Sequence, residues 1–397
     1  MIFVSIVLDG VGVGAQPDAD AYGDVGSNTL GHVCETVHPS LPHLAELGLG
    51  CIVPLNGVPC PDQPRGRYGR MREVSAGKDS TTGHWELAGL RLDHPFPTYP
   101  DGFPDDVIDG FIDATGCGGV LGNRPASGTT IVQKMGDEHR RTGHPIVYTS
   151  ADSVFQVAAH KDVVPLETLY DWCRTARSEI CTGEHGVGRV IARPFVGSSG
   201  AYERISAERR DFSRRPEAPP LQDVLGEHGV RTVSIGKIYD LFARTGFDEA
   251  IKTSDNAEGI AAVHEELRQH EAGDPPTFVW ANLVDFDQAY GHRNDPEGFA
   301  EALEEFDRAV PDLLEALPAD GRLVITADHG NDPTTGSTDH AREYVPVLDY
   351  TPGDVPDPSR ADMGLRPSFN DHAATVASWF DVPYETEGTP FEAPPAH

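Results

Sequence analysis

Three strongly apolar segments, each followed closely by acidic residues, constrain the fold more than any other feature of this chain. They cover residues 2–8, 277–283 and 322–327. Continuous apolar runs of this length are typical of strands that are buried on both faces of a parallel sheet. Ligand sites in such sheets lie at the carboxyl ends of the strands. The sequence therefore predicts an α/β fold that gathers carboxylates along one edge of its sheet.

Helical patterns separate and follow these strands. Apolar residues recur every three or four positions over 299–317, which predicts a helix that Pro311 kinks. Further helices are expected over 261–270 and 373–380. The alternation of strands and helices is that of an α/β sheet flanked by helices. The tail from Tyr384 is rich in Pro and Glu, and we expect it to fray.

The middle of the chain is predicted to form a domain of its own. Proline-rich stretches at 95–104 and 214–220 are typical of crossings between domains. The part between them has its own expected strands, at 146–148 and 189–196, and a helix at 163–174. We predict a discontinuous core of residues 1–95 and 218–397, with an inserted, smaller α/β cap domain of residues 96–217.

Acidic and histidine side chains follow the three apolar segments. The candidate metal ligands are Asp9, Asp285, Asp287, His292, Asp328, His329, Asp332, Asp339 and His340. Mixed carboxylate and imidazole ligands suit Zn²⁺ or Mn²⁺, and two such ions can clamp the attacking and leaving oxygens of a phosphoryl group. In a chain with 63 acidic residues and 17 histidines, a single Asp–His pair is more often a surface feature. The prediction of a dinuclear site rests on three clusters at strand ends.

A hydroxyl-rich turn supplies a candidate nucleophile. Ser80 follows the flexible Gly77 and comes directly before an expected helix. The amides and the dipole at a helix N-terminus favour an attached phosphate. The simpler interpretation is that Asp79 and Ser80 only cap this helix, and the residues alone leave both interpretations open.

Composition limits the partners and the location. The 63 Asp and Glu residues against 31 Lys and Arg give a net charge of −32, which disfavours binding to nucleic acid or to anionic membranes. No apolar run approaches the roughly 18 residues needed to span a bilayer, and residues 2–8 indicate a short strand and not a signal peptide. The six cysteines form no C-x-x-C pair, so we expect reduced thiols in a cytoplasmic protein. Without a long exposed apolar stripe, we expect a monomer.

Five motifs resemble, in order, those of the alkaline phosphatase superfamily and, within it, of the phosphopentomutases. They are DGVGVG (9–14), GKDSTTGHWE (77–86), NRPASG (123–128) with YTSADSVFQ (148–156), NLVDFD (282–287) with GHR (291–293), and TADHGND (326–332) with TDHAREY (338–344). The resemblance implies an alkaline-phosphatase-like core with a mostly parallel sheet, and a cap domain that covers the active site. It also implies a phosphoprotein of nucleoside and pentose phosphate metabolism.

The resemblance assigns roles to the candidate metal ligands and to the nucleophile. One Mn²⁺ would be held by Asp9, Asp328 and His329, and the other by Asp287, His292 and His340. The phosphorylated hydroxyl falls on Ser80, where the family usually has Thr. Thr81 and Thr82 are the alternatives.

The resemblance also implies substrate-binding residues. In the cap, Ser150, Asp152, Arg189 and Arg204 fall on positions expected to hold the sugar phosphate, and Lys237 would approach it from the core. The implied enzyme is an isomerase. It would interconvert ribose or deoxyribose 1-phosphate and 5-phosphate through a phospho-enzyme and a 1,5-bisphosphate, with a sugar bisphosphate as activator.

Three alternatives stand beside this function. A cofactor-independent phosphoglycerate mutase usually spaces its second-metal Asp and His four apart, whereas Asp287 and His292 are five apart. A metal-dependent phosphatase or phosphodiesterase would need an open site, and the long insertion at 96–217 argues against that. An acidic, non-catalytic protein that holds divalent cations would not depend on the hydroxyl of Ser80.

Overall fold

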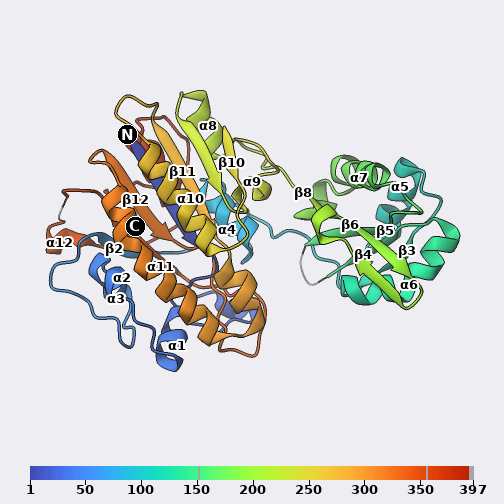
Figure 1. Cartoon of the computed structure of the whole chain (residues 1–397), viewed down its shortest axis with the longest axis horizontal. Coiled ribbons are helices and arrows are strands. Elements are labelled where there is room, and N and C mark those ends of the chain that lie inside the picture. The colour runs from blue at the N-terminus through green and yellow to red at the C-terminus, as the bar shows by residue number, and fades with distance from the viewer. Residues whose placement is uncertain (151–152, 355, 393–397) are drawn as a thin grey trace. The chain divides into compact units, whose positions relative to one another are not determined.

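The computed structural model describes residues 1–150, 153–354 and 356–392, and the chain forms two compact units (Figure 1). The core unit contains residues 1–94 and 216–397, and the second unit contains residues 95–215, inserted between the two parts of the core. Among the described residues, no helix has the length and apolar character needed to cross a membrane. That the second unit covers the active site stays a prediction.

An eight-stranded sheet forms the centre of the core unit. Its strands are β1 (Ile2–Leu8), β2 (Arg67–Met71), β9 (Arg231–Ile235), β10 (Glu249–Ile251), β11 (Thr277–Leu283), β12 (Gly321–Thr326), β13 (Val345–Tyr350) and β14 (Asp362–Arg366). The strand order is β10-β9-β11-β1-β12-β13-β2-β14. The first five strands run parallel, and only β13 is antiparallel to its neighbours. The predicted α/β fold with a mostly parallel sheet is confirmed.

The register of the three central strands brings their carboxyl ends together. Leu8, the last residue of β1, pairs with Leu283, the last residue of β11. Val7 pairs with Thr326, the last residue of β12. All three predicted strands are therefore present, and the polar residues that follow them emerge side by side at one edge of the sheet.

Helices flank the core sheet, and Figure 1 shows α10 and α11 lying next to each other across it. The helices of the core are α1 (Thr29–Thr36), α2 (Pro42–Leu47), α3 (Leu49–Ile52), α4 (Ser80–Leu87), α8 (Leu221–Glu227), α9 (Ile238–Leu241), α10 (Asn256–Gln269), α11 (Pro296–Ala316), α12 (Pro358–Ala361) and α13 (Asn370–Trp379). The apolar positions predicted for α11, such as Phe299, Leu303 and Phe306, are buried. The helix continues beyond Pro311 to its end at Ala316.

The expectation of a frayed tail is wrong for its described part. Tyr384 Oη donates a hydrogen bond of 2.7 Å to the carbonyl of Ala88. Arg366 donates to the carbonyls of Thr389 and Pro390, and Phe391 is buried. Hydrogen bonds to an internal arginine hold this segment, and composition alone does not reveal them.

The second unit has its own sheet and its own apolar core. Its strands are β3 (Leu121–Pro125), β4 (Ile146–Thr149), β5 (Val154–His160), β6 (Arg189–Ser198), β7 (Ala201–Arg204) and β8 (Arg210–Ser213), and its α-helices are α5 (Asp105–Thr115), α6 (Gly128–Thr142) and α7 (Leu166–Thr175). Along β4, Val147 belongs to one apolar cluster and Tyr148 to another. Because successive side chains in a strand point to opposite faces, both faces of this sheet are packed.

A disulfide bond corrects the expectation that all six cysteines are reduced. Cys51 and Cys60 are bonded, whereas Cys34, Cys117, Cys173 and Cys181 are free. The pairing depends on a tight bridge between Leu55 and Val58 that returns the chain toward α3. A separation of nine residues gives no such indication in the sequence.

Loss of this disulfide is expected to destabilise the core without affecting catalysis. A crosslink that closes a loop of about ten residues reduces the conformational entropy of the unfolded chain. This stabilises the folded state by about 2–3 kcal/mol. Urea unfolding of the Cys51→Ser/Cys60→Ser double variant should show that loss, with unchanged turnover of substrate. An unfolding free energy equal to that of the wild type would contradict the expected contribution.

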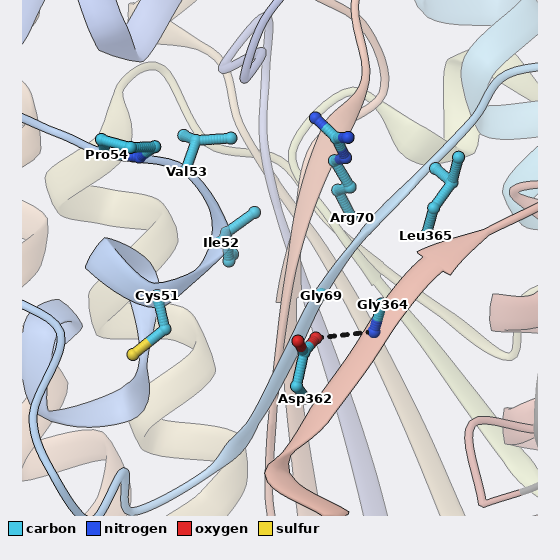
Figure 2. Close-up of a pocket in the computed structure, with 9 residues that line it drawn as sticks. All are labelled: Cys51, Ile52, Val53, Pro54, Gly69, Arg70, Asp362, Gly364 and Leu365. Carbon is cyan, nitrogen blue, oxygen red and sulfur yellow. Dashed lines mark hydrogen bonds between the residues drawn. The ribbon is translucent and has the colours of Figure 1, made fainter.

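A cavity of about 390 Å³ lies beside this disulfide (Figure 2). It is lined by Cys51 and the residues that follow it and by residues of β2 and β14, including Arg70 and Asp362. Asp362 accepts a hydrogen bond of 2.7 Å from the amide of Gly364. Its nine lining residues include none of the predicted site residues, so the cavity is separate from the predicted metal site.

His372, a buried residue of α13, is expected to make the stability of the core depend on pH. His372 Nδ1 donates to the carbonyl of Leu87 at 2.8 Å, and its Nε2 lies 2.7 Å from Ser5 Oγ. Burial lowers the pKa of His372 to about 4, assisted by the charges of His84 and Arg322. As the pH falls, the His372 side chain is therefore protonated in the unfolded chain before it is protonated in the folded protein. The contribution of neutral His372 to the free energy of unfolding is fully present above the ordinary histidine pKa of about 6.5. It is lost as the pH falls toward 4.

The His372→Asn variant should lack this pH dependence. Between pH 7.5 and 4.5 the wild type should lose about 2–3 kcal/mol more unfolding free energy than the variant. Chemical denaturation at both pH values measures the difference, and His94→Asn, at an exposed position, is the matched control. Parallel losses in the wild type and the His372 variant would contradict the assignment.

Candidate metal centre

The first predicted ligand group converges at the edge where the central strands end. Asp9 follows β1 directly, and Asp328 and His329 come shortly after β12. All three are buried, and their ligand atoms lie within 4.8 Å of one another. His329 Nε2 is 3.3 Å from Asp9 Oδ1 and 3.4 Å from Asp328 Oδ2.

The second ligand group adjoins the first. Asp287 lies in the helical turn Phe286–Tyr290, which follows β11. Its Oδ2 is 3.2 Å from His292 Nε2, and its Oδ1 is 3.6 Å from His340 Nε2. The rings of His329 and His340 are 4.3 Å apart, centroid to centroid. His329 thus lies between the two groups, and all six candidate ligands come together.

The buried oxygens of this cluster fit a metal ion. Both carboxylate oxygens of Asp9, and Oδ2 of Asp328, are buried and receive no hydrogen bond of normal geometry from the described residues. Lys237 Nζ contacts Asp9 Oδ2, and His84 Nδ1 lies 3.0 Å from Asp328 Oδ2. Buried carboxylates without donors are costly unless they are paired or coordinate a metal. The oxygen and nitrogen donors present are those that divalent transition metals prefer.

Neighbouring charges in the site shift the pKa values of its acidic and histidine side chains. Burial opposes the charge on Asp287, but the hydrogen bond from His292 and the charge of His340 hold the pKa of Asp287 well below its usual range. Burial likewise disfavours protonation of His329, yet the neighbouring Asp328 and Asp9 raise the pKa of His329 to about 10. The cluster is therefore an anionic pocket that stabilises positive charge.

Ser80 lies at the N-terminus of α4, next to this cluster. Ser80 Oγ is 3.1 Å from His329 Nε2 and accepts a hydrogen bond of 2.9 Å from Lys237 Nζ. The helix packs directly against the candidate ligands because Gly83 has no side chain: a Cβ there would be 2.1 Å from the carbonyl oxygen of Asp328. Lys237, predicted to approach a sugar phosphate, contacts Ser80 and Asp9.

The structure shows that the candidate nucleophile Ser80 is not the cap of its helix. Asp79 is the N-cap, and its Oδ1 accepts from the amides of Thr81 and Thr82. Thr82 Oγ1 is buried and donates to Asp79 Oδ2 at 2.6 Å. Ser80 is thus not needed as the cap, and its hydroxyl lies beside the candidate ligand His329.

Two further residues support the site and were not predicted. His84, one turn after Ser80, makes both of its contacts through one ring nitrogen. Its Nδ1 donates to the Ser80 carbonyl at 2.9 Å and also lies 3.0 Å from Asp328 Oδ2. Asn331 Nδ2 donates to Asp287 Oδ1 at 2.8 Å. The spacing of Ser80 and His84 by one helical turn was the available signal for His84. Nothing in the sequence indicates Asn331 beyond its position two residues after His329.

The predicted cap residues all belong to the second unit. Ser150 and Arg189 are partly buried there, and Arg204 is exposed. Arg189 Nη1 is 3.6 Å from a carboxylate oxygen of Asp211. Asp152 lies outside the described residues. The roles of these four residues stay predictions.

Comparisons with known proteins show which family this chain resembles. Residues 1–384 match the model of the Metalloenzyme superfamily. The chain is 53% identical over 389 residues to the phosphopentomutase of Acetivibrio thermocellus, covering 98% of each chain. It is 53% identical over 390 residues to that of Deinococcus radiodurans, covering 97% of each.

A solved structure supports the fold. The phosphoglycerate mutase of Leishmania mexicana superposes with a TM-score of 0.50 at 13% identity, covering 98% of this chain and 96% of the other. At that identity the likeness shows a shared fold alone. The predicted alkaline-phosphatase-like architecture is confirmed by this shared fold and by the superfamily match. The superfamily match and the clustered ligand groups indicate that the chain depends on a divalent metal.

Proposed function

The chain belongs to the phosphopentomutase family, and from this we propose that its metal cluster and Ser80 interconvert pentose 1-phosphates and pentose 5-phosphates. The observation that carries the proposal is the position of Ser80 Oγ, 3.1 Å from His329 Nε2 and 2.9 Å from Lys237 Nζ. A hydroxyl at a helix N-terminus beside a divalent-metal cluster is suited to carry a phosphoryl group. The sugar would be ribose or 2-deoxyribose.

We assign two Mn²⁺ ions to the six clustered ligands. One ion would be held by Asp9, Asp328 and His329, and the other by Asp287, His292 and His340. When bound, such ions stabilise the negative charge that develops on a transferring phosphoryl group. The convergent, donor-poor carboxylate oxygens support this assignment.

The remaining groups of the core orient and stabilise the phosphate. The dipole of α4 and the ammonium of Lys237 present positive charge to a phosphate on Ser80. Asp79 caps the helix and leaves the Ser80 hydroxyl available. His84 links the Ser80 carbonyl to Asp328, so the nucleophile and the metal ligand are held by one side chain.

The proposed cycle begins with phosphate on Ser80. The C1 hydroxyl of ribose 5-phosphate takes this phosphate, the bond to Ser80 Oγ breaks, and ribose 1,5-bisphosphate forms. The bisphosphate then returns its 5-phosphate to Ser80, which leaves ribose 1-phosphate. A sugar bisphosphate would activate the enzyme by supplying the first phosphate to Ser80.

The second unit would provide the remaining sugar-phosphate contacts. Ser150, Asp152, Arg189 and Arg204 are the residues we propose for it. Exclusion of water during transfer would separate a mutase from a hydrolase. A cytoplasmic location and a monomeric state remain parts of this proposal.

Phosphorus NMR tests the proposed function. Purified protein with Mn²⁺ and a trace of ribose 1,5-bisphosphate is incubated with ribose 5-phosphate, with 2-deoxyribose 5-phosphate, or with 3-phosphoglycerate. A C1-phosphate signal that EDTA abolishes supports the proposal. Steady release of inorganic phosphate would indicate a hydrolase, and turnover of 3-phosphoglycerate alone would indicate a phosphoglycerate mutase; either result would reject it.

A further inference from the structure

The segment that leads to Ser80 is held by one arginine. Residues 72–79, between β2 and α4, form neither helix nor strand. Arg342 Nη1 donates to the carbonyls of Ser75 and Gly77, at 2.8 and 2.7 Å, and its Nη2 donates to the carbonyl of Glu73 at 2.9 Å. Three alternate carbonyls of this irregular segment thus depend on a single guanidinium.

Arg342 itself is fixed on several sides. Its side chain is 2% exposed. Nη1 lies 2.9 Å from Glu73 Oε2, and Nη2 lies 3.1 Å from Asp18 Oδ2. Its guanidinium carbon is 4.9 Å from the centre of the Tyr22 ring. A planar group held by two carboxylates and a ring has one orientation, so the carbonyls bound to it have fixed positions.

A second set of contacts joins residues 72–79 to the segment that contains Arg342. The backbone amide of Arg342 donates to Asp24 Oδ2 at 2.9 Å. Lys78, two residues before Ser80, donates to Asp24 Oδ1 at 3.0 Å and lies 3.2 Å from Asp339 Oδ2. Asp339 directly precedes the metal ligand His340. The segment that carries a metal ligand and the segment that carries the nucleophile are therefore bound to each other through Arg342, Asp24 and Lys78.

We propose that Arg342 is a positioning residue for phosphoryl transfer, which fixes Ser80 relative to the metal ligands without touching the reacting atoms. The inference rests on the proposed function and adds a residue to its machinery. Transfer requires the attacking and leaving oxygens to be aligned, and displacement of a reacting group by about 1 Å can cost roughly 100-fold in rate. Without Arg342, the carbonyls of Glu73, Ser75 and Gly77 would lose their side-chain donor, two of them in buried positions, and the segment could shift the start of α4.

Two substitutions and a matched control test this role. Arg342→Met removes every donor, and Arg342→Lys keeps the charge but cannot form the planar fork. Arg366→Lys is the control because Arg366 is equally buried, pairs with Asp371, and donates to the carbonyls of Thr389 and Pro390. The tail segment that Arg366 holds carries no site residue.

The readouts are steady-state kinetics with ribose 1-phosphate, thermal unfolding, and amide hydrogen exchange of residues 72–80. For Arg342→Met we expect kcat to fall about 100-fold, with KM changed less than about threefold. Arg342→Lys should recover part of kcat. Both variants should exchange the amides of 72–80 faster than the wild type, whereas Arg366→Lys should lower thermal stability with wild-type kcat and wild-type exchange in that segment.

Two results overturn the inference. Wild-type kcat in folded Arg342→Lys and Arg342→Met would show that the arginine does not position Ser80. Unchanged exchange of residues 72–80 in both variants would show the same without any reference to a substrate. Failure of the proposed function is distinguishable, because the wild type itself would then not convert ribose 1-phosphate.

Discussion

Replacement of Ser80 by alanine is expected to abolish pentose phosphate turnover. Loss of the nucleophile in an enzyme that works through a covalent intermediate typically costs about 10⁶-fold in kcat. The Ala variant lacks the only hydroxyl that lies beside both His329 and Lys237 among the described residues. Thermal stability should stay close to that of the wild type, because Asp79 and not Ser80 caps α4. Steady-state kinetics and thermal unfolding of the same preparation measure both effects.

Two neighbouring substitutions control for this effect. Ser80→Thr keeps the oxygen and adds one methyl group, so we expect a loss no greater than about 10- to 100-fold. Thr81→Ala should keep most of the activity, because the Thr81 side chain has no part in the proposed transfer. Substantial turnover by Ser80→Ala, or its loss in Thr81→Ala, would move the nucleophile away from Ser80.

Replacement of Asp328 by asparagine is expected to impair metal binding and catalysis together. The variant keeps the shape of the side chain but removes a negative charge that faces His84 and His329 at 3.0 and 3.4 Å. Unpaired positive charge in a buried cluster is strongly destabilising. We expect Mn²⁺ affinity to fall and kcat at saturating Mn²⁺ to fall by about 10³-fold. Calorimetric titration with Mn²⁺ and steady-state kinetics measure the two effects.

A buried carboxylate elsewhere in the core is the matched control. Asp349 is fully buried and accepts from Arg322 Nε at 2.7 Å, but it is not among the clustered ligand groups. Asp349→Asn should lower stability while leaving Mn²⁺ affinity unchanged. If Asp328→Asn bound Mn²⁺ as tightly as the wild type does, the assignment of Asp328 as a ligand would be wrong.

The sheet and the metal cluster could be predicted because apolar runs and strand ends are local features. Each buried strand is a continuous apolar segment, and parallel register then brings Asp9, Asp287 and Asp328 together without further information. The position of each motif relative to a strand leaves nine acidic and histidine candidates, and the resemblance to the phosphopentomutases selects six of them. Their distances, and the position of His329 between two groups, needed the folded chain.

Other features depend on contacts that no local pattern reveals. Asp79 and Ser80 are both good N-cap residues, so only the backbone could show which one caps α4. The pairing of Cys51 with Cys60 depends on the turn between them. Arg342 binds backbone carbonyls, which every residue type offers, so neither its partners nor its effect on residues 73–77 has a sequence signature.

The central claim is that Ser80 carries the phosphate that moves between the two positions of the sugar. Mass spectrometry of tryptic peptide 79–91 tests this directly, after incubation of the protein with ribose 1,5-bisphosphate and Mn²⁺ and again after addition of ribose 5-phosphate. We predict one phosphate on Ser80, discharged by ribose 5-phosphate with formation of the bisphosphate. Phosphate on Thr81 or Thr82, an unmodified peptide, or discharge to water alone would contradict the account.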